Sequence, residues 1–188
     1  MSEHPAPVPV LALSGPVGVG KTTVLEEIHD VLASHGVPHA CVERDALAYS
    51  WPPRGHFNDQ AALENLAAVW ANFRAAGAGR LVVAGVIERV ADLDGYRRAV
   101  PGAQITVCRL TAAAATRAAR LRAREVGAGL EWHLRRTEEL EAILDAVRLH
   151  DFAVDNDARP VREVATEVLA RAGWLPPLGI THRSPGST

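Results

Sequence analysis

The most informative segment of the sequence lies near the N-terminus: Gly15-Pro16-Val17-Gly18-Val19-Gly20-Lys21-Thr22. It matches the pattern G-x-x-x-x-G-K-[ST] in full, between an apolar run at residues 10–14 and a helical pattern over 22–35. Glycines let the backbone curve so that successive N–H groups face phosphate oxygens, and the helix that follows adds the positive end of its dipole. The stretch therefore predicts a loop that binds a nucleoside triphosphate.

Lys21 is the only lysine among the 20 basic residues of the chain, and all the others are arginines. A compact ammonium suits the β- and γ-phosphates inside a curved loop, whereas a planar guanidinium on a longer stem does not fit. The hydroxyl of Thr22 can coordinate Mg²⁺, and Thr23 belongs to the same first helical turn. We therefore expect the loop, Thr22 and Thr23 to bind ATP as co-substrate, with Mg²⁺ as cofactor.

The composition limits what else the chain can be. Of its 188 residues 48% are apolar and 22% are charged, which is enough for one domain with a buried core. A formal charge of -2 argues against broad binding of nucleic acid. No membrane span or signal peptide is expected, and Cys41 and Cys108 lie in apolar runs typical of reduced thiols in a cytoplasmic protein. Nothing in the sequence separates a monomer from a homodimer.

Short apolar runs alternate with helical patterns along the chain. Strands are expected at residues 10–14, 39–43, 80–87, 104–110 and 152–155, and helices at 22–35, 59–76, 93–99, 111–125, 132–149 and after Pro160. The third run, LVVA, does not alternate, as is typical of a strand buried on both faces of a parallel sheet. We predict an α/β three-layer sandwich with a five-stranded parallel sheet, as one domain over 10–175 with flexible tails at 1–9 and 176–188.

Acidic residues follow two of the predicted strands. Glu43 and Asp45 come after the second strand and Glu88 comes after the third, which itself runs into Gly85 rather than into an aspartate that could hold a metal. Open α/β sheets build their sites at the C-terminal ends of the strands. Asp45 is therefore expected to orient or deprotonate an acceptor hydroxyl, and Glu43 or Asp45 could hold a water on Mg²⁺. The simpler interpretation is a solvated loop acid or a helix cap.

Three segments resemble the small P-loop kinases of the nucleoside-monophosphate-kinase-like group. The phosphate loop is the first, and Val42-Glu43-Arg44-Asp45 is similar to the acid-x-acid segment of adenylylsulfate kinases and gluconate kinases. Arg120-Leu121-Arg122-Ala123-Arg124, followed by glycines, is similar to the arginine-bearing lid of gluconate kinase-like proteins. The resemblance implies a P-loop NTPase fold, a mobile helical lid at about 117–135, and transfer of the ATP γ-phosphoryl group to a small molecule.

Arginines and one tryptophan complete the expected site. Arg120 and Arg124 lie one helical turn apart, so a closing lid can bring them onto the transferring phosphoryl group as catalytic residues beside Lys21 and Asp45. The acceptor pocket is expected to contain Glu43, Arg44, Trp51, Arg54, Glu88 and Arg89. Its tryptophan can stack on a sugar or a base, and its arginines can pair with an anionic group. In similar kinases the segment after the last strand wraps the adenine, which singles out Asn156 and Arg159.

These features predict an ATP-dependent phosphotransferase that acts on a hydroxyl of a small-molecule acceptor. A nucleoside or nucleotide kinase is the enzymatic alternative, since Arg44 with Arg54 or Arg89 could hold an acceptor phosphate. An ATP-binding regulatory module with little transfer activity is the alternative from another class. No Cys/His cluster shows metal-ligand spacing in the sequence, so a structural zinc is not expected.

Overall fold

The computed structural model describes residues 6–175. Its elements are β1 (Val8–Ser14), α1 (Lys21–Ser34), β2 (Ala40–Glu43), η1 (Asp45–Ala48), η2 (His56–Asn58), α2 (Asp59–Ala75), β3 (Leu81–Ala84), α3 (Val90–Ala99), β4 (Ala103–Thr111), α4 (Ala114–Arg124), α5 (Gly127–Val147), β5 (Phe152–Asp155) and α6 (Val161–Arg171). The C-terminal tail predicted at 176–188 lies outside the described residues, as do residues 1–5.

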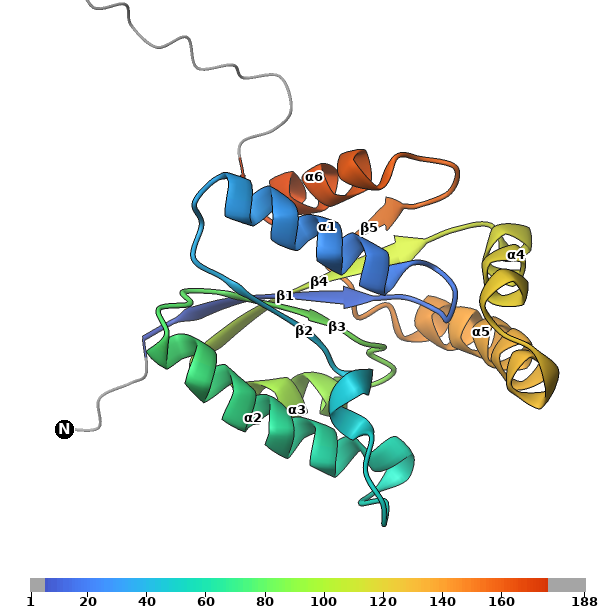
Figure 1. Cartoon of the computed structure of the whole chain (residues 1–188), viewed down its shortest axis with the longest axis horizontal. Helices are drawn as coiled ribbons and strands as arrows, with labels where there is room; N and C mark the ends of the chain where they lie inside the picture. The colour runs from blue at the N-terminus through green and yellow to red at the C-terminus, as the bar shows by residue number, and fades with distance from the viewer. Residues whose placement is uncertain (1–5, 176–188) are drawn as a thin grey trace, which may run out of the picture.

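The strands form one five-stranded parallel sheet in the order β2-β3-β1-β4-β5. This confirms the predicted sheet and places β1, with the phosphate loop at its end, in the centre. In Figure 1, α1 and α6 cover one face, α2 and α3 cover the other, and α4 and α5 stand at one end of the sheet. Because all the strands run in the same direction, the segments after β1, β2 and β3 meet at a single edge.

Each face of the sheet has its own hydrophobic core. Leu11 and Leu13 of β1 point into the core beneath α1 and α6, whereas Val10 and Ala12 point into the core beneath α2 and α3. The residues of β3 divide in the same way, and all four are buried. Burial on both faces explains why the LVVA run shows no alternation of apolar and polar residues.

The predicted boundary between the N-terminal tail and the first strand is wrong. β1 begins at Val8, two residues before its predicted start, because Val8 and Pro9 pair with Ala103 and Gln104 of β4. The side chain of Val8 is buried in the core beneath α2 and α3. The longer β4, and not a local signal near the terminus, therefore sets the start of β1.

The break between the lid helices is also displaced from its predicted position. Glu125 and Val126 adopt extended backbone angles, whereas Gly127 and Gly129 lie in the first turn of α5 instead of interrupting the helix. The Glu125 carboxylate contacts Arg124 and His133, which holds the junction in this extended form. None of the helices in residues 6–175 is long and apolar enough to cross a membrane.

The two cysteines are unpaired, as predicted. Cys41 lies on β2 and Cys108 on β4, and two other strands separate them in the sheet. This separation is too large for a disulfide. Burial raises the pKa of both thiols to about 12, so both are protonated at neutral pH.

Buried ion pairs hold α5 against the sheet. Arg109 of β4 is 7% exposed in its side chain and pairs with Glu141 and Asp145, each at 2.7 Å. Arg117 of α4, which is also buried, pairs with the same Glu141 at 2.9 Å. One carboxylate therefore joins β4, α4 and α5, and removing its charge would leave two buried guanidinium groups with fewer partners.

We expect Glu141→Gln to lower the free energy of unfolding by about 3 kcal/mol, because it removes the shared partner of two buried cations. Chemical denaturation followed by circular dichroism measures this loss. Glu138→Gln, at an exposed position on the same helix, is the matched control and should be nearly neutral. Equal stabilities for the two variants would show that these ion pairs do not hold α5.

Candidate active site

The phosphate loop curves tightly between β1 and α1. Gly18 and Gly20 have φ angles of 80° and 100°, which lie in the left-handed region that favours glycine. A Cβ on Gly20 would lie 2.6 Å from the side-chain nitrogen of Asn156. The positions of these glycines in the motif are therefore fixed both by backbone angle and by close packing.

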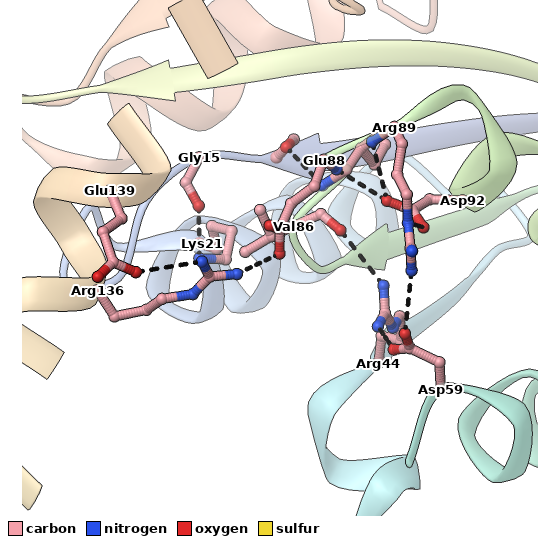
Figure 2. Close-up of polar contacts among 12 residues, drawn as sticks. Gly15, Lys21, Arg44, Asp59, Val86, Glu88, Arg89, Asp92, Arg136 and Glu139 are labelled. Atoms are coloured by element: carbon pink, nitrogen blue, oxygen red, sulfur yellow. Dashed lines mark hydrogen bonds and ion pairs between the residues drawn. The ribbon is translucent and has the colours of Figure 1, made fainter. Parts of the chain in front are cut away.

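The Lys21 ammonium lies inside this curve. Nζ donates a hydrogen bond to the Gly15 carbonyl oxygen at 2.9 Å (Figure 2) and another to the Pro16 carbonyl oxygen at 3.2 Å. Burial lowers the pKa of Lys21, whereas the negative charges of Asp45 and Glu43 raise it. Glu43 at the end of β2 and Asp45 just after it thus act electrostatically on the lysine of the loop, as expected for parts of one site.

Side chains from three other segments hold the loop from outside. The Val19 carbonyl accepts hydrogen bonds from Asn156 Nδ2 at 2.7 Å and from an Arg120 guanidinium nitrogen at 3.0 Å. The Val17 carbonyl accepts one from Thr137 Oγ1 at 2.7 Å. With these carbonyls directed outward, the curved backbone is oriented to present N–H groups to a phosphate on its inner side.

The two predicted catalytic arginines have different surroundings. Arg120 is partly buried, and besides Val19 it donates to the Asn156 carbonyl at 2.9 Å, so it joins the phosphate loop to the segment after β5. Arg124 is 61% exposed and pairs with Glu125 at 2.6 Å. Its charge lowers the pKa of Lys21, which places Arg124 within electrostatic reach of the phosphate site. A catalytic role for either arginine stays a prediction.

Arg44 begins a chain of charged contacts along the sheet edge. It pairs with Asp59 at the start of α2 and donates to the Val86 carbonyl at 3.3 Å (Figure 2). Asp59 also pairs with Arg89 at 3.4 Å, and Arg89 pairs with Asp92 at 3.1 Å. Two of the predicted acceptor-binding arginines are thus brought together through one carboxylate.

Glu88 meets a residue that the sequence did not single out. Its carboxylate accepts a hydrogen bond from Arg136 of α5 at 2.5 Å, and the Arg136 guanidinium lies over the Phe57 ring, 5.5 Å from its centroid. Figure 2 shows Arg136 extending from α5 toward the loop after β3. The buried positions Thr137, Leu140 and Leu144 mark the inner face of α5, and this periodicity was the available signal.

A cavity of about 630 Å³ opens beside this chain of contacts, between α2 and α3. Charged residues line it with both signs: Arg44, Asp59, Glu64, Arg89, Asp92 and Arg98. Gln60 and small or apolar residues, including Ala67 and Gly95, form the rest of its wall. Because Arg44 stands between Glu43 and Asp45 in the sequence, the cavity adjoins the segment that acts electrostatically on Lys21.

The other residues predicted for the acceptor pocket do not line this cavity. The Trp51 side chain is 88% exposed. Arg54 pairs with Glu64 at the surface, where both side chains are 51% exposed. Asn58 precedes α2 but makes no capping hydrogen bond with its side chain; it donates to Ser50 Oγ at 2.7 Å and accepts from the Arg54 N–H at 2.6 Å. This buried amide determines the path of the loop and therefore directs Trp51 and Arg54 outward.

The predicted nucleotide-binding residues outside the loop lie at its two sides. Thr22 and Thr23 are exposed at the start of α1. The Asn156 side chain is buried against Val19, and Arg159 donates to the Asp155 carbonyl at 3.0 Å and pairs with Glu167 at 2.9 Å. A contact of Asn156 or Arg159 with a nucleotide base stays a prediction.

Known structures share this architecture. No protein-family model matches the chain, and no curated protein matches it in sequence. Among solved structures, a gluconokinase from Sinorhizobium meliloti is 24% identical with a TM-score of 0.53, and the match covers 90% of this chain and 93% of that one. A tunicamycin resistance protein from Deinococcus radiodurans is 20% identical with a TM-score of 0.62, covering 89% and 97%.

A Mycobacterium tuberculosis APS kinase, solved in complex with AMPPNP and APS, is 17% identical with a TM-score of 0.51, covering 88% of this chain and 97% of that one. At these identities the likeness is one of fold. The fold is that of the P-loop small-molecule kinases, which confirms the fold implied by the sequence resemblance.

The position of Asn156 separates two possible roles. If it acts by holding the Val19 carbonyl, Asn156→Ala should weaken the binding of ATP and of inorganic tripolyphosphate equally, by about five- to tenfold for one lost hydrogen bond. If it contacts the base, only ATP binding should fall. Titration calorimetry with the two ligands measures the difference, and we expect equal losses because the amide already donates to Val19.

Proposed function

We propose that the chain transfers the γ-phosphoryl group of Mg-ATP to a hydroxyl of a small-molecule acceptor bound in the cavity between α2 and α3. The observation that carries the proposal is the position of Lys21. The only lysine of the chain lies inside the phosphate loop, and Asp45 and Glu43 act electrostatically on it from the end of β2. The likeness of the fold to small-molecule kinases supports the same class of reaction.

The oxygen donors at this edge fit Mg²⁺. The Thr22 hydroxyl, at the exposed start of α1, and the carboxylates of Glu43 and Asp45 are hard ligands of the kind that Mg²⁺ prefers. A bound Mg²⁺ would neutralise charge on the β- and γ-phosphates. Thr22 is assigned to the ion directly, and Glu43 or Asp45 would hold it through a water.

The transfer needs positioning and charge neutralisation more than covalent chemistry by the protein. The acceptor oxygen bonds to the γ-phosphorus while the bond from that phosphorus to the β,γ-bridging oxygen breaks, so ADP leaves with the bridging oxygen. The hydroxyl proton passes to the Asp45 carboxylate and then to solvent. The Lys21 ammonium stabilises the charge on the phosphate oxygens, and Arg124 adds a second positive charge on closure of the lid.

The cavity lining favours an acceptor that carries both a hydroxyl and an anionic group. Arg44, Arg89 and Arg98 offer guanidinium groups suited to a carboxylate or a phosphate, and nearby carboxylates can accept hydrogen bonds from hydroxyls. A sugar acid meets these requirements. A nucleotide acceptor is the second candidate, because three arginines around one cavity could hold its phosphate.

We expect Asp45→Asn to reduce phosphoryl transfer by ~100-fold or more, since it removes the proton acceptor but keeps the size of the side chain. The affinity for ATP should stay within about twofold, because the loop, Thr22 and Glu43 remain to bind the nucleotide and Mg²⁺. A panel of sugars, sugar acids, nucleosides, nucleotides and nucleoside antibiotics, scored by ADP release, first identifies the acceptor. Asp30→Asn, at an exposed position on α1, is the matched control.

Two results would contradict this assignment. If ATP affinity fell together with transfer in Asp45→Asn, the residue would act in nucleotide binding. If ADP release did not rise with any member of the panel while ATP still bound, the regulatory module would be favoured over the kinase.

A second variant tests where the acceptor binds. Arg89→Gln should raise the KM of the acceptor by about tenfold through loss of a charge-assisted contact, and it should leave the KM of ATP unchanged. Arg97→Gln, on the helix that Arg89 directly precedes but outside the cavity lining and paired with Asp94 at the surface, should leave both constants unchanged. Equal acceptor KM values for the two variants would place the acceptor outside this cavity.

A further inference from the structure

A cluster of nitrogen and sulfur side chains lies between α1 and β2. His29 belongs to α1, His39 directly precedes β2, and Cys41 lies on β2. One ligand atom from each, two ring nitrogens and the thiol sulfur, all lie within 4.8 Å of one another. Asp45 follows the far end of β2, and Lys21 lies about two helical turns before His29 at the start of α1, so the cluster is separate from the site proposed for transfer.

The fold explains why residues without metal-ligand spacing in the sequence meet here. His39 and Cys41 are two positions apart along an extended segment, so their side chains point to the same side of the sheet. Cys41 packs against the core beneath α1 and α6, which identifies that side. His29 lies on the exposed surface of α1, and β2 is an edge strand, so the cluster is open to solvent.

Backbone contacts orient one of the imidazoles as a metal ligand requires. His39 Nδ1 lies 2.7 Å from the Val37 carbonyl oxygen, and only a protonated ring nitrogen can donate to a carbonyl. In the neutral ring the lone pair is therefore on Nε2. That atom faces His29 Nδ1 at 2.9 Å, so the lone pair points into the cluster. A second hydrogen bond of this kind, which fixes the tautomer, is typical of histidines that bind metals.

The donor set and its spacing suit a small divalent ion. Tetrahedral Zn²⁺ with nitrogen ligands at about 2.0 Å and sulfur at 2.3 Å separates its ligand atoms by about 3.3 to 3.6 Å. The separations in the cluster reach at most 4.8 Å, about 1.3 Å above this spacing, and the two ring nitrogens at 2.9 Å lie about 0.4 Å below it, so small side-chain rotations are sufficient to reach the geometry. Two imidazoles and a thiolate favour Zn²⁺ over Mg²⁺ or Ca²⁺, which prefer oxygen.

We propose that His29, His39 and Cys41 form a three-ligand Zn²⁺ site with its fourth position open to water. Binding replaces the Cys41 thiol proton, which is released to solvent, and forms Zn–S and Zn–N bonds. The ion would join the exposed side of α1 to the edge strand β2. This inference is independent of the proposed transfer reaction.

Cobalt substitution of the full chain tests the proposal directly. Co²⁺ added to the purified protein without nucleotide should produce the near-ultraviolet charge-transfer band of a cobalt–thiolate bond. Zn²⁺ should displace the Co²⁺ and remove this band at one Zn²⁺ ion per chain. Cys41→Ser should abolish this band. His29→Ala should weaken Zn²⁺ binding by ~10-fold or more, as expected when a tuned ligand shell is broken.

His35→Ala is the matched control, since it removes another exposed histidine near the end of α1 without touching the cluster. It should leave both the band and the affinity unchanged. Absence of the band in the unsubstituted protein would overturn the proposal. Equal Zn²⁺ affinities of His29→Ala and His35→Ala would also overturn the proposal. Because His29 is exposed, its substitution does not disturb the core.

Discussion

A buried ammonium stays charged only where oxygens surround it, and Lys21 meets this condition through its own loop. Two loop carbonyls accept its hydrogen bonds, and the carboxylates of Glu43 and Asp45 support its charge from the end of β2. The curve of the loop provides those carbonyls, and Asn156, Arg120 and Thr137 hold the curve from outside. The order of the strands brings all these groups to one edge.

Arginine has two kinds of role in this chain. Arg109 and Arg117 are buried ion-pair partners of Glu141 and hold the lid helices to the sheet. Arg44 and Arg89 are also paired, through Asp59, but they border a cavity and keep donors available to a ligand. Both pairs of arginines have carboxylate partners. They differ in that Arg109 and Arg117 are buried, whereas Arg44 and Arg89 line the cavity.

The sequence predicted well what depends on local patterning. The motif at residues 15–22, the non-alternating LVVA run and the order of strands and helices were sufficient for the five-stranded parallel sheet. Features that depend on packing between distant segments were missed. The pairing of Arg136 with Glu88 joins residues 48 positions apart, and the approach of His29 to His39 depends on how α1 lies on the sheet. The path of Trp51 depends on the buried amide of Asn58, whose left-handed backbone no residue pattern indicated.

The contacts that fix α5 are distributed unevenly along it. Thr137, Glu141 and Asp145 bind its second half to the phosphate loop and to β4, whereas Trp132 near its start is 42% exposed and meets Phe57 edge-on at 6.3 Å. The ten residues before Thr137 extend for about 15 Å as a helix, so a tilt of about 10° there moves the tip by roughly 2.6 Å. Within this half, Arg136 contacts Glu88 close to Thr137, so a tilt of the segment before it would pivot at the phosphate loop and at the loop after β3.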